Sequence, residues 1–238
     1  MHAGGVSRLR APADGMEISE PDDGEALSFL NGLYPVSRES FEALERYRAL
    51  LSAWQAKTNL VAPGTLNAFW SRHVGDSLQV LALFPSTNHW IDLGSGAGFP
   101  GLVIAIAQIG KTGCSHVLVE SNSKKCAFLR TVARETGADA AIVNGRIESV
   151  AKQYAESQPL PEIVTARALA PLPRLLELAE PLLAKGAIGL FHKGREFAAE
   201  IEDCRSLWRF DLVIHESRIA AGSVLLEVRN LARADARR

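Results

Sequence analysis

Several features that mark specialised proteins are scarce in this chain of 238 residues. Only three cysteines are present, at unrelated spacings, so the sequence indicates neither a disulfide framework nor a metal site. Neither sign of charge dominates, because 26 Lys and Arg stand against 27 Asp and Glu, and a nucleic-acid partner would need a local basic patch. No apolar run approaches the roughly 20 residues of a membrane span. A globular protein without membrane contact is expected.

The two ends of the chain differ in composition from the rest. Residues 1–24 are rich in Gly, Ala, Pro and acidic residues and carry almost no large apolar side chain, which predicts a disordered leader. This segment lacks the apolar stretch of a secretory signal, and its five acidic residues argue against a transit peptide, so we expect a cytoplasmic protein. Residues 231–238 are predicted to form a flexible basic tail.

Residues 25–85 show the apolar period of helices and predict a small helical cap. Ser37 is a suitable N-cap for a first helix, Pro63 and Gly64 interrupt the pattern, and Asn67 can open a second helix that Pro85 ends.

From residue 86 to 230 the pattern changes to short apolar strands that alternate with helical segments. Such alternation predicts an α/β core with a mostly parallel sheet. Only a short Ala-Ala-Gly region separates the last two strands, so these two should form an antiparallel hairpin. Seven strands that end in such a hairpin are typical of the Rossmann-like class I S-adenosylmethionine-dependent methyltransferases. The expected strands are Trp90–Leu93, His116–Glu120, Ala140–Val143, Ile163–Arg167, Ala187–His192, Asp211–Ile214 and Val224–Arg229.

A glycine-rich turn follows the first of these strands. Gly94, Gly96 and Gly98 stand at alternate positions, and an apolar helical segment comes next. Asp92, two residues before Gly94, resembles the acid of motif I of the methyltransferases, which helps to fix the turn and can face the methionine ammonium. We therefore expect Asp92 and the three glycines to contact the cofactor. Glycine allows the backbone a positive φ and a close approach of a ligand. Phe99 occupies the place of the last small residue in the dinucleotide fingerprint, which disfavours a nicotinamide cofactor. A turn that uses glycine for geometry alone is the alternative to a ligand site.

Two further segments bear on ligand binding. Glu120 ends the second strand, close to the roughly 20-residue offset at which a carboxylate meets ribose hydroxyls, although alone it could be a solvated strand end. Ile147 and Glu148 follow the third strand, where the adenine lies in this fold. Glu148 alone could equally be an acid in the first turn of a helix.

Several segments together resemble the bacterial 16S ribosomal RNA methyltransferase G family, also called glucose-inhibited division protein B. The resemblance covers about residues 27–230 and is carried by WQAKTNLVAP, RHVGDSL, IDLGSGAGFPG, NGRIES, TARALAPL and FHKG, in that order. It implies methylation of guanine N7 in 16S rRNA, with S-adenosyl-L-methionine as donor and S-adenosyl-L-homocysteine as product. The cofactor contacts that it implies are Gly94, Phe99, Ile147, Glu148 and Arg167, to which the strand-end argument adds Glu120.

Two positions depart from the family pattern. Gly75 stands where a large aliphatic residue is usual, and it could loosen its helix or allow a closer contact. Val61 stands where Thr is common.

Guanine N7 has a lone pair and no proton, so its methylation needs no general base, and we expect no catalytic acid or base. The sequence has no Asn/Asp-Pro-Pro-aromatic segment and no Pro-Cys pair, which other classes of methyl transfer use. Possible contacts with guanine or RNA each have a structural alternative. It is a local ion pair for Arg167, for example with Glu162, and a solvated lysine for Lys193. For His73 and Asp76 it is a pair on the helix surface, and Asn59 in the preceding loop has the same ambiguity.

Two other functions compete with this interpretation: an NAD-dependent oxidoreductase, and a non-catalytic RNA-binding or assembly factor on the same scaffold. The position of Phe99 disfavours the first, and the intact glycine turn with Glu120 disfavours the second. We expect the protein to act as a monomer, because a pocket within one chain needs no partner subunit.

Overall fold

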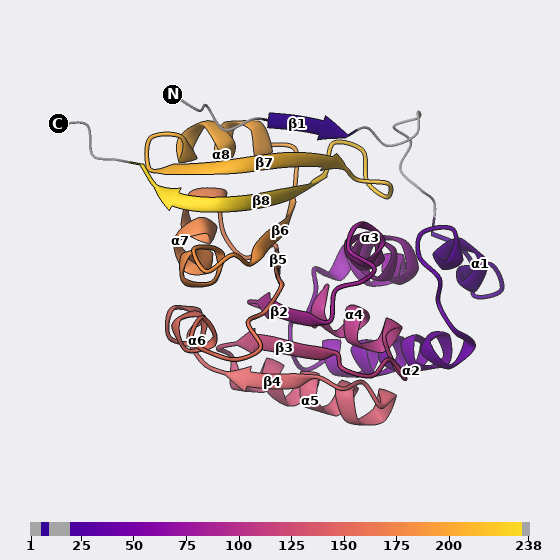
Figure 1. Cartoon of the computed structure of the whole chain (residues 1–238). Helices are drawn as coiled ribbons and strands as arrows, with labels where there is room; N and C mark the ends of the chain where they lie inside the picture. Colours follow the sequence, from indigo (N-terminus) through magenta and orange to yellow (C-terminus); the bar gives the residue numbers. More distant parts are fainter. Residues whose placement is uncertain (1–5, 10–19, 235–238) are drawn as a thin grey trace.

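A mixed β-sheet organises the computed structural model, which describes residues 6–9 and 20–234 (Figure 1). Within this part of the chain the sheet has eight strands in the order β1-β7-β8-β6-β5-β2-β3-β4. All neighbours are parallel except β8, which is antiparallel to both β6 and β7. The strands are β1 (Val6–Leu9), β2 (His89–Leu93), β3 (Ser115–Glu120), β4 (Ala141–Asn144), β5 (Ile163–Arg167), β6 (Ile188–Lys193), β7 (Trp208–Glu216) and β8 (Val224–Arg233).

Helices cover both faces of this sheet and bury one hydrophobic cluster on each face. The first cluster joins α1 (Ala26–Asn31), α2 (Arg38–Gln55), the π-helix η2 (Phe69–Gly75), α3 (Asp76–Leu83), α4 (Gly101–Ala107) and α5 (Ser123–Thr136). The second joins α6 (Ile147–Tyr154), α7 (Leu172–Leu183) and α8 (Phe197–Cys204). A short 3-10 helix, η1 (Pro63–Ala68), precedes η2. No helix in the described ranges is long and apolar enough to cross a membrane.

The class I methyltransferase architecture expected from the sequence is confirmed. β2 to β8 are the seven expected strands, and β7 and β8 form the antiparallel hairpin. β7 and β8 are longer than expected, and the additional residues include the buried Trp208 and Leu231.

Both chain ends differ from the expected disorder where the structure describes them. Val6–Leu9 pairs in parallel with β7 as β1. β7 would otherwise be an edge strand, and its free backbone N–H and C=O groups can pair with a segment of any composition. At the other end Leu231 is buried and Arg233 forms an ion pair with Glu180. Residues 1–5, 10–19 and 235–238 lie outside the described part.

The helical cap shares its core with the sheet. Ser37 caps α2 as expected, with its side chain accepting a hydrogen bond from the Ser40 amide. α2 packs on α4 and α5, so the first cluster continues without a break across the expected boundary at residue 85. The cap therefore completes the layer that faces the glycine turn.

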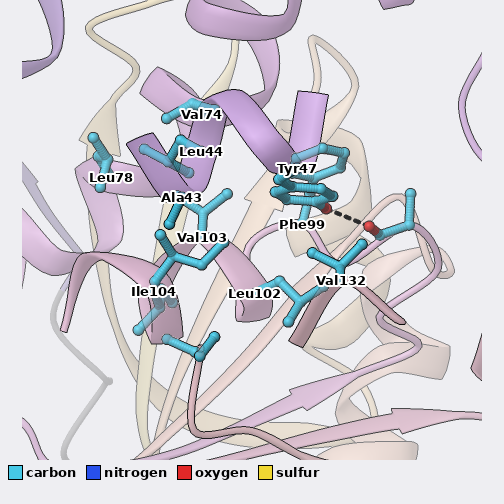
Figure 2. Packing of buried hydrophobic residues seen from close by; sticks show 14 of the residues in the cluster. Ala43, Leu44, Tyr47, Val74, Leu78, Phe99, Leu102, Val103, Ile104 and Val132 are labelled. Carbon is cyan, nitrogen blue, oxygen red and sulfur yellow. Dashed lines mark hydrogen bonds between the residues drawn. The ribbon is translucent and has the colours of Figure 1, made fainter. Parts of the chain in front are cut away.

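Tyr47 of α2 connects the cap to that turn directly. The tyrosine is fully buried, and its ring stacks on Phe99 with 5.3 Å between centroids. Its hydroxyl donates a hydrogen bond to the Ala97 carbonyl, drawn as the dashed line in Figure 2. One side chain thus supplies both apolar packing and a polar tie to the turn.

Replacing Tyr47 by Phe should lower the free energy of unfolding by about 1–2 kcal/mol, because the buried Ala97 carbonyl loses its partner. Urea denaturation at neutral pH measures the change. Tyr34→Phe is the matched control, because Tyr34 is half-buried and its hydroxyl has no hydrogen bond among the described residues. Equal stability changes in the two variants would contradict the role of the Tyr47 hydroxyl.

Candidate active site

A cavity of about 690 Å³ opens at the carboxyl ends of β2, β3 and β5, where ligands bind in open α/β sheets. We call it the main cavity. The core contributes Gly94, Ser95, Gly96, Ala97, Phe99, Glu120, Ser121, Lys125, Arg146, Ile147, Glu148, Arg167, Ala168, Leu169 and Leu178. The cap and the β7–β8 loop contribute Leu60, Val61, Ala62, Thr65, Arg72, His73, Asp76, Ile219 and Ala220.

The three glycines of the turn all have positive φ, which permits the tight bend after β2. Their surroundings differ. A Cβ on Gly94 would lie 2.5 Å from the Leu169 side chain, and one on Gly98 would lie 2.8 Å from the Tyr47 hydroxyl. A Cβ on Gly96 would find no atom closer than 3.8 Å. Gly94 and Gly96 line the main cavity, whereas Gly98 faces the cap and does not.

Asp92, expected to contact the cofactor, lies behind the turn and does not line the main cavity. Its buried carboxylate accepts hydrogen bonds from the Thr165 hydroxyl at 2.8 Å and the Gly101 amide at 3.4 Å. Burial raises the pKa of Asp92 to about 6, although these hydrogen bonds favour the charged form. Asp92 therefore ties β2 to β5 and to the start of α4.

Glu120 faces the main cavity and is only 8% exposed, so it is not a solvated strand end. One carboxylate oxygen accepts a hydrogen bond from the Gly96 amide at 3.0 Å, and the other accepts one from the Asn122 amide at 2.7 Å. This carboxylate lies directly beside the glycine turn, as the spacing predicts.

Ile147 and Glu148 also line the main cavity, at the first turn of α6. Glu148 forms an ion pair with Arg174 at 2.7 Å. A hydrogen bond from its own backbone amide lowers the pKa of Glu148, and Arg146 and Arg174 act in the same direction. Glu148 is thus both a helix-start acid and a residue of the cavity.

Arg167 is held by the cap and not by Glu162, which instead accepts hydrogen bonds from backbone amides of residues 88 and 89. The Arg167 guanidinium donates to Asp76 Oδ2 at 3.1 Å, to the Arg72 carbonyl at 2.8 Å and to His73 Nδ1 at 2.8 Å. It also lies over the Phe99 ring, 5.1 Å from the centroid. The end of β5 is thereby joined to η2 and α3.

His73 is a buried, neutral residue in this cluster. Its ring stacks on Phe99 with 4.5 Å between centroids, and Nε2 lies 3.2 Å from the Thr65 hydroxyl. Burial, together with the positive charge of Arg167, lowers the pKa of His73 to about 3. Because Nδ1 accepts from Arg167, neutral His73 carries its proton on Nε2, and its lone pair is already engaged.

The remaining expected RNA contacts lie in different surroundings. Lys193 is buried, lines a second cavity of about 310 Å³, and donates to Glu200 at 2.6 Å and the Ala170 carbonyl at 2.7 Å. It is therefore not a solvated lysine. Asn59 is exposed and lines neither cavity, whereas the three residues after it line the main cavity.

Two residues of the site come from segments with a weak signal or none in the sequence. Lys125, one turn into α5, lines the main cavity, and the sequence identifies it only as one of four basic residues on a helix, for which a solvated face is the more common explanation than a phosphate contact. Ile219 comes from the β7–β8 loop, for which no local signal exists. A Cβ on Gly75 would lie 3.2 Å from the Ile219 side chain, so this departure from the family pattern allows a close contact of η2 with that loop. Val61, the other departure, lines the main cavity.

Comparisons with known sequences agree on one family. The model of rRNA small subunit methyltransferase G matches residues 40–225. Ribosomal RNA small subunit methyltransferase G of Methylorubrum populi is 48% identical over 200 residues, which are 84% of this chain and 93% of that protein. The protein of the same name from Rhodopseudomonas palustris is 41% identical over 218 residues, 92% of each chain.

Solved structures share the fold at low sequence identity. An O-methyltransferase from Bacillus cereus in complex with S-adenosylhomocysteine has a TM-score of 0.55 and 13% identity, over 86% of this chain and 96% of that one. A methyltransferase from Geobacter sulfurreducens has a TM-score of 0.52 and 17% identity, over 90% and 99% of the two chains. These likenesses show a common architecture.

The lowered pKa of His73 predicts acid sensitivity. The unfolded chain protonates this histidine below pH of about 6.5, whereas the folded protein does not until pH of about 3, so acid favours unfolding in this window. Between pH 6.5 and 4, wild type should lose about 1 kcal/mol per pH unit more than His73→Gln. The raised pKa of Asp92 acts with the opposite sign, but it is common to both proteins and cancels. Urea titrations across this range measure the difference, and parallel curves would contradict it.

Proposed function

The chain belongs to the rRNA small subunit methyltransferase G family, and from this premise we propose that it transfers a methyl group from S-adenosylmethionine to N7 of one guanine in 16S rRNA. The observation that carries the proposal is the Glu120 carboxylate beside Gly96 on the wall of a cavity large enough for a nucleoside. An NAD-dependent oxidoreductase is disfavoured by Phe99 in the turn. An intact glycine turn and acid argue against a non-catalytic binding factor.

The residues of the main cavity fit the donor. We assign the backbone of Gly94 and Gly96 to its amino-acid part, Glu120 to the ribose hydroxyls, and Ile147 to the adenine face. Each oxygen of the Glu120 carboxylate accepts one hydrogen bond from the backbone and has a lone pair left for a hydroxyl. Phe99, Glu148 and Arg167 complete the set. Asp92 and Gly98 act behind the turn, where they set its shape.

When bound, S-adenosylmethionine supplies a methyl group on a positively charged sulfur. The protein contributes by orientation, since holding two reactants together can lower a barrier by roughly 7–11 kcal/mol. Arg167 fixes the wall at the end of β5 through its bonds to Asp76 and His73. No side chain is assigned as acid or base, because guanine N7 has no proton to lose and the free lone pair of His73 already accepts from Arg167.

The proposed function also has consequences for where the protein acts, which residues contact RNA and whether it acts as a monomer. From the proposed RNA substrate we infer that the protein acts in the cytoplasm, where small subunits assemble. Arg72 of the cap and Lys125 of α5 both line the main cavity. Neither side chain has a carboxylate partner among the described residues, so both can meet RNA phosphates. One chain supplies every group named here, in agreement with a monomer.

The substitution Gly96→Ala should weaken binding of S-adenosylhomocysteine at least about tenfold, because the new Cβ would occupy the open space of the cavity. Isothermal titration calorimetry measures the dissociation constant. Gly110→Ala is the control: Gly110 also has positive φ and open surroundings, but it lies outside the cavity. The strain is similar in both, about 1 kcal/mol, so equal loss of affinity would refute the assignment.

The activity itself is tested on small ribosomal subunits from cells that lack the gene. Incubation with the purified protein and S-adenosylmethionine should add one methyl group to 16S rRNA, located at guanine N7 by mass mapping and by strand cleavage specific for N7-methylguanine. Stabilisation by NAD and not by S-adenosylhomocysteine in a thermal-shift assay would refute the proposal, as would a methyl group on another atom.

A further inference from the structure

The second cavity adjoins the main one at the carboxyl ends of β5 and β6. The two cavities share Arg167, Ala168 and Leu169, which therefore form a common wall. Methyl transfer needs an acceptor next to the donor, and the main and second cavities are neighbouring compartments. We propose that the second cavity receives the target guanine and that Glu200 and Lys193 recognise its Watson–Crick edge. This inference rests on the proposed function.

A buried ion pair lies in the polar part of the second cavity, which Arg167 and His192 also line. Lys193 Nζ lies 2.6 Å from Glu200 Oε2, and the two side chains are 7% and 22% exposed. Lys193 also donates to the Ala170 carbonyl, and the same Glu200 oxygen accepts from the Leu172 amide. These contacts use two of the three Nζ hydrogens and one of the two carboxylate oxygens. The third hydrogen and Glu200 Oε1 have no partner among the described residues.

The unused donor and acceptor match guanine. The Watson–Crick edge of guanine presents the acceptor O6 beside the donors N1–H and N2–H₂, whereas adenine presents a donor beside an acceptor. Lys193 can donate to O6 while Glu200 Oε1 accepts from N1–H and N2–H₂. N7 lies on another edge of the ring, so it stays free for the methyl group. The pair would therefore select guanine over adenine.

The same two residues hold the wall between the cavities. Through Ala170 and Leu172 they fix both sides of Pro171 at the start of α7. Ala168, at the other end of this loop, has φ of +52°, which a residue other than glycine seldom adopts unless its surroundings impose it. Leu169 then packs against Gly94 of the donor turn. The wall that would contact the base thus also contacts the donor site.

A change in the base tests the direct contact without altering the protein. Inosine keeps O6, N1–H and N7 of guanine and lacks only the N2 amine. Small subunits would be reconstituted with 16S rRNA that carries guanine or inosine at the mapped target position. For wild type, kcat/KM on inosine should fall about tenfold, since the Glu200 carboxylate loses a hydrogen bond to the N2 amine.

The variant Glu200→Gln tests the same contact by a change in the protein. The glutamine oxygen can keep the contacts with Leu172 and Lys193, which turns the amide N–H₂ toward the donors of guanine. The variant should lose at least about tenfold in kcat/KM on guanine and should no longer prefer guanine to inosine. A residue with a structural role alone would lower both rates equally and keep the preference. Glu196→Gln, on the exposed N-cap position of α8 and outside both cavities, is the matched control and should behave as wild type.

The outcomes separate the two proposals. If wild type methylates neither RNA, the proposed function fails. If wild type methylates guanine and inosine equally well, or if folded Glu200→Gln keeps the wild-type preference, the function stands and the base pocket is refuted. Binding of S-adenosylhomocysteine shows whether the variant is folded with an intact donor site. If it is not, the wild-type comparison alone decides.

Discussion

The ion pair between Arg167 and Asp76 is the interaction on which the site depends. It joins the end of β5 to the start of α3, two elements that are 91 residues apart in sequence. Both side chains are less than one-fifth exposed, so losing either partner would leave a charge largely removed from water, at a typical cost of about 3–5 kcal/mol. Arg167 also donates hydrogen bonds to His73 and to the Arg72 carbonyl, so acceptors within one turn of η2 help to stabilise its positive charge.

The cap forms part of the main cavity, and the Arg167–Asp76 ion pair and Tyr47 are the contacts that hold it there. Tyr47 fixes the outer side of the glycine turn, while Arg167 fixes the opposite wall of the main cavity. Phe99 lies between them, stacked on both Tyr47 and His73. Aromatic side chains of the cap thus pack against the glycine turn on one side of the main cavity. Cap and core share one hydrophobic cluster because neither face is covered without the other.

Buried charge is used differently in the two cavities. In the main cavity the Glu120 carboxylate accepts hydrogen bonds from two backbone amides, and each of its oxygens keeps a lone pair for a ligand. In the second cavity Glu200 is neutralised by Lys193, which leaves a donor and an acceptor side by side. The first arrangement offers acceptors alone, which suits the hydroxyls proposed for this site. The second offers a donor and an acceptor, which suits the proposed base edge.

The sequence by itself determined the strands, the hairpin, the glycine turn and the position of Glu120, because these follow from local apolar period, glycine content and the convergence of parallel strand ends. It could not show that Asp92 faces inward, since β2 is buried on both faces and alternation carries no information there. Nor could it show the partners of Arg167 and Lys193, or the pairing of β1 with β7. Tertiary packing determines which side chains distant in sequence come into contact. β1 pairs with β7 through backbone hydrogen bonds, which do not depend on a pattern of side chains. Only the tertiary structure therefore decided which charges meet, and it placed two cavities side by side.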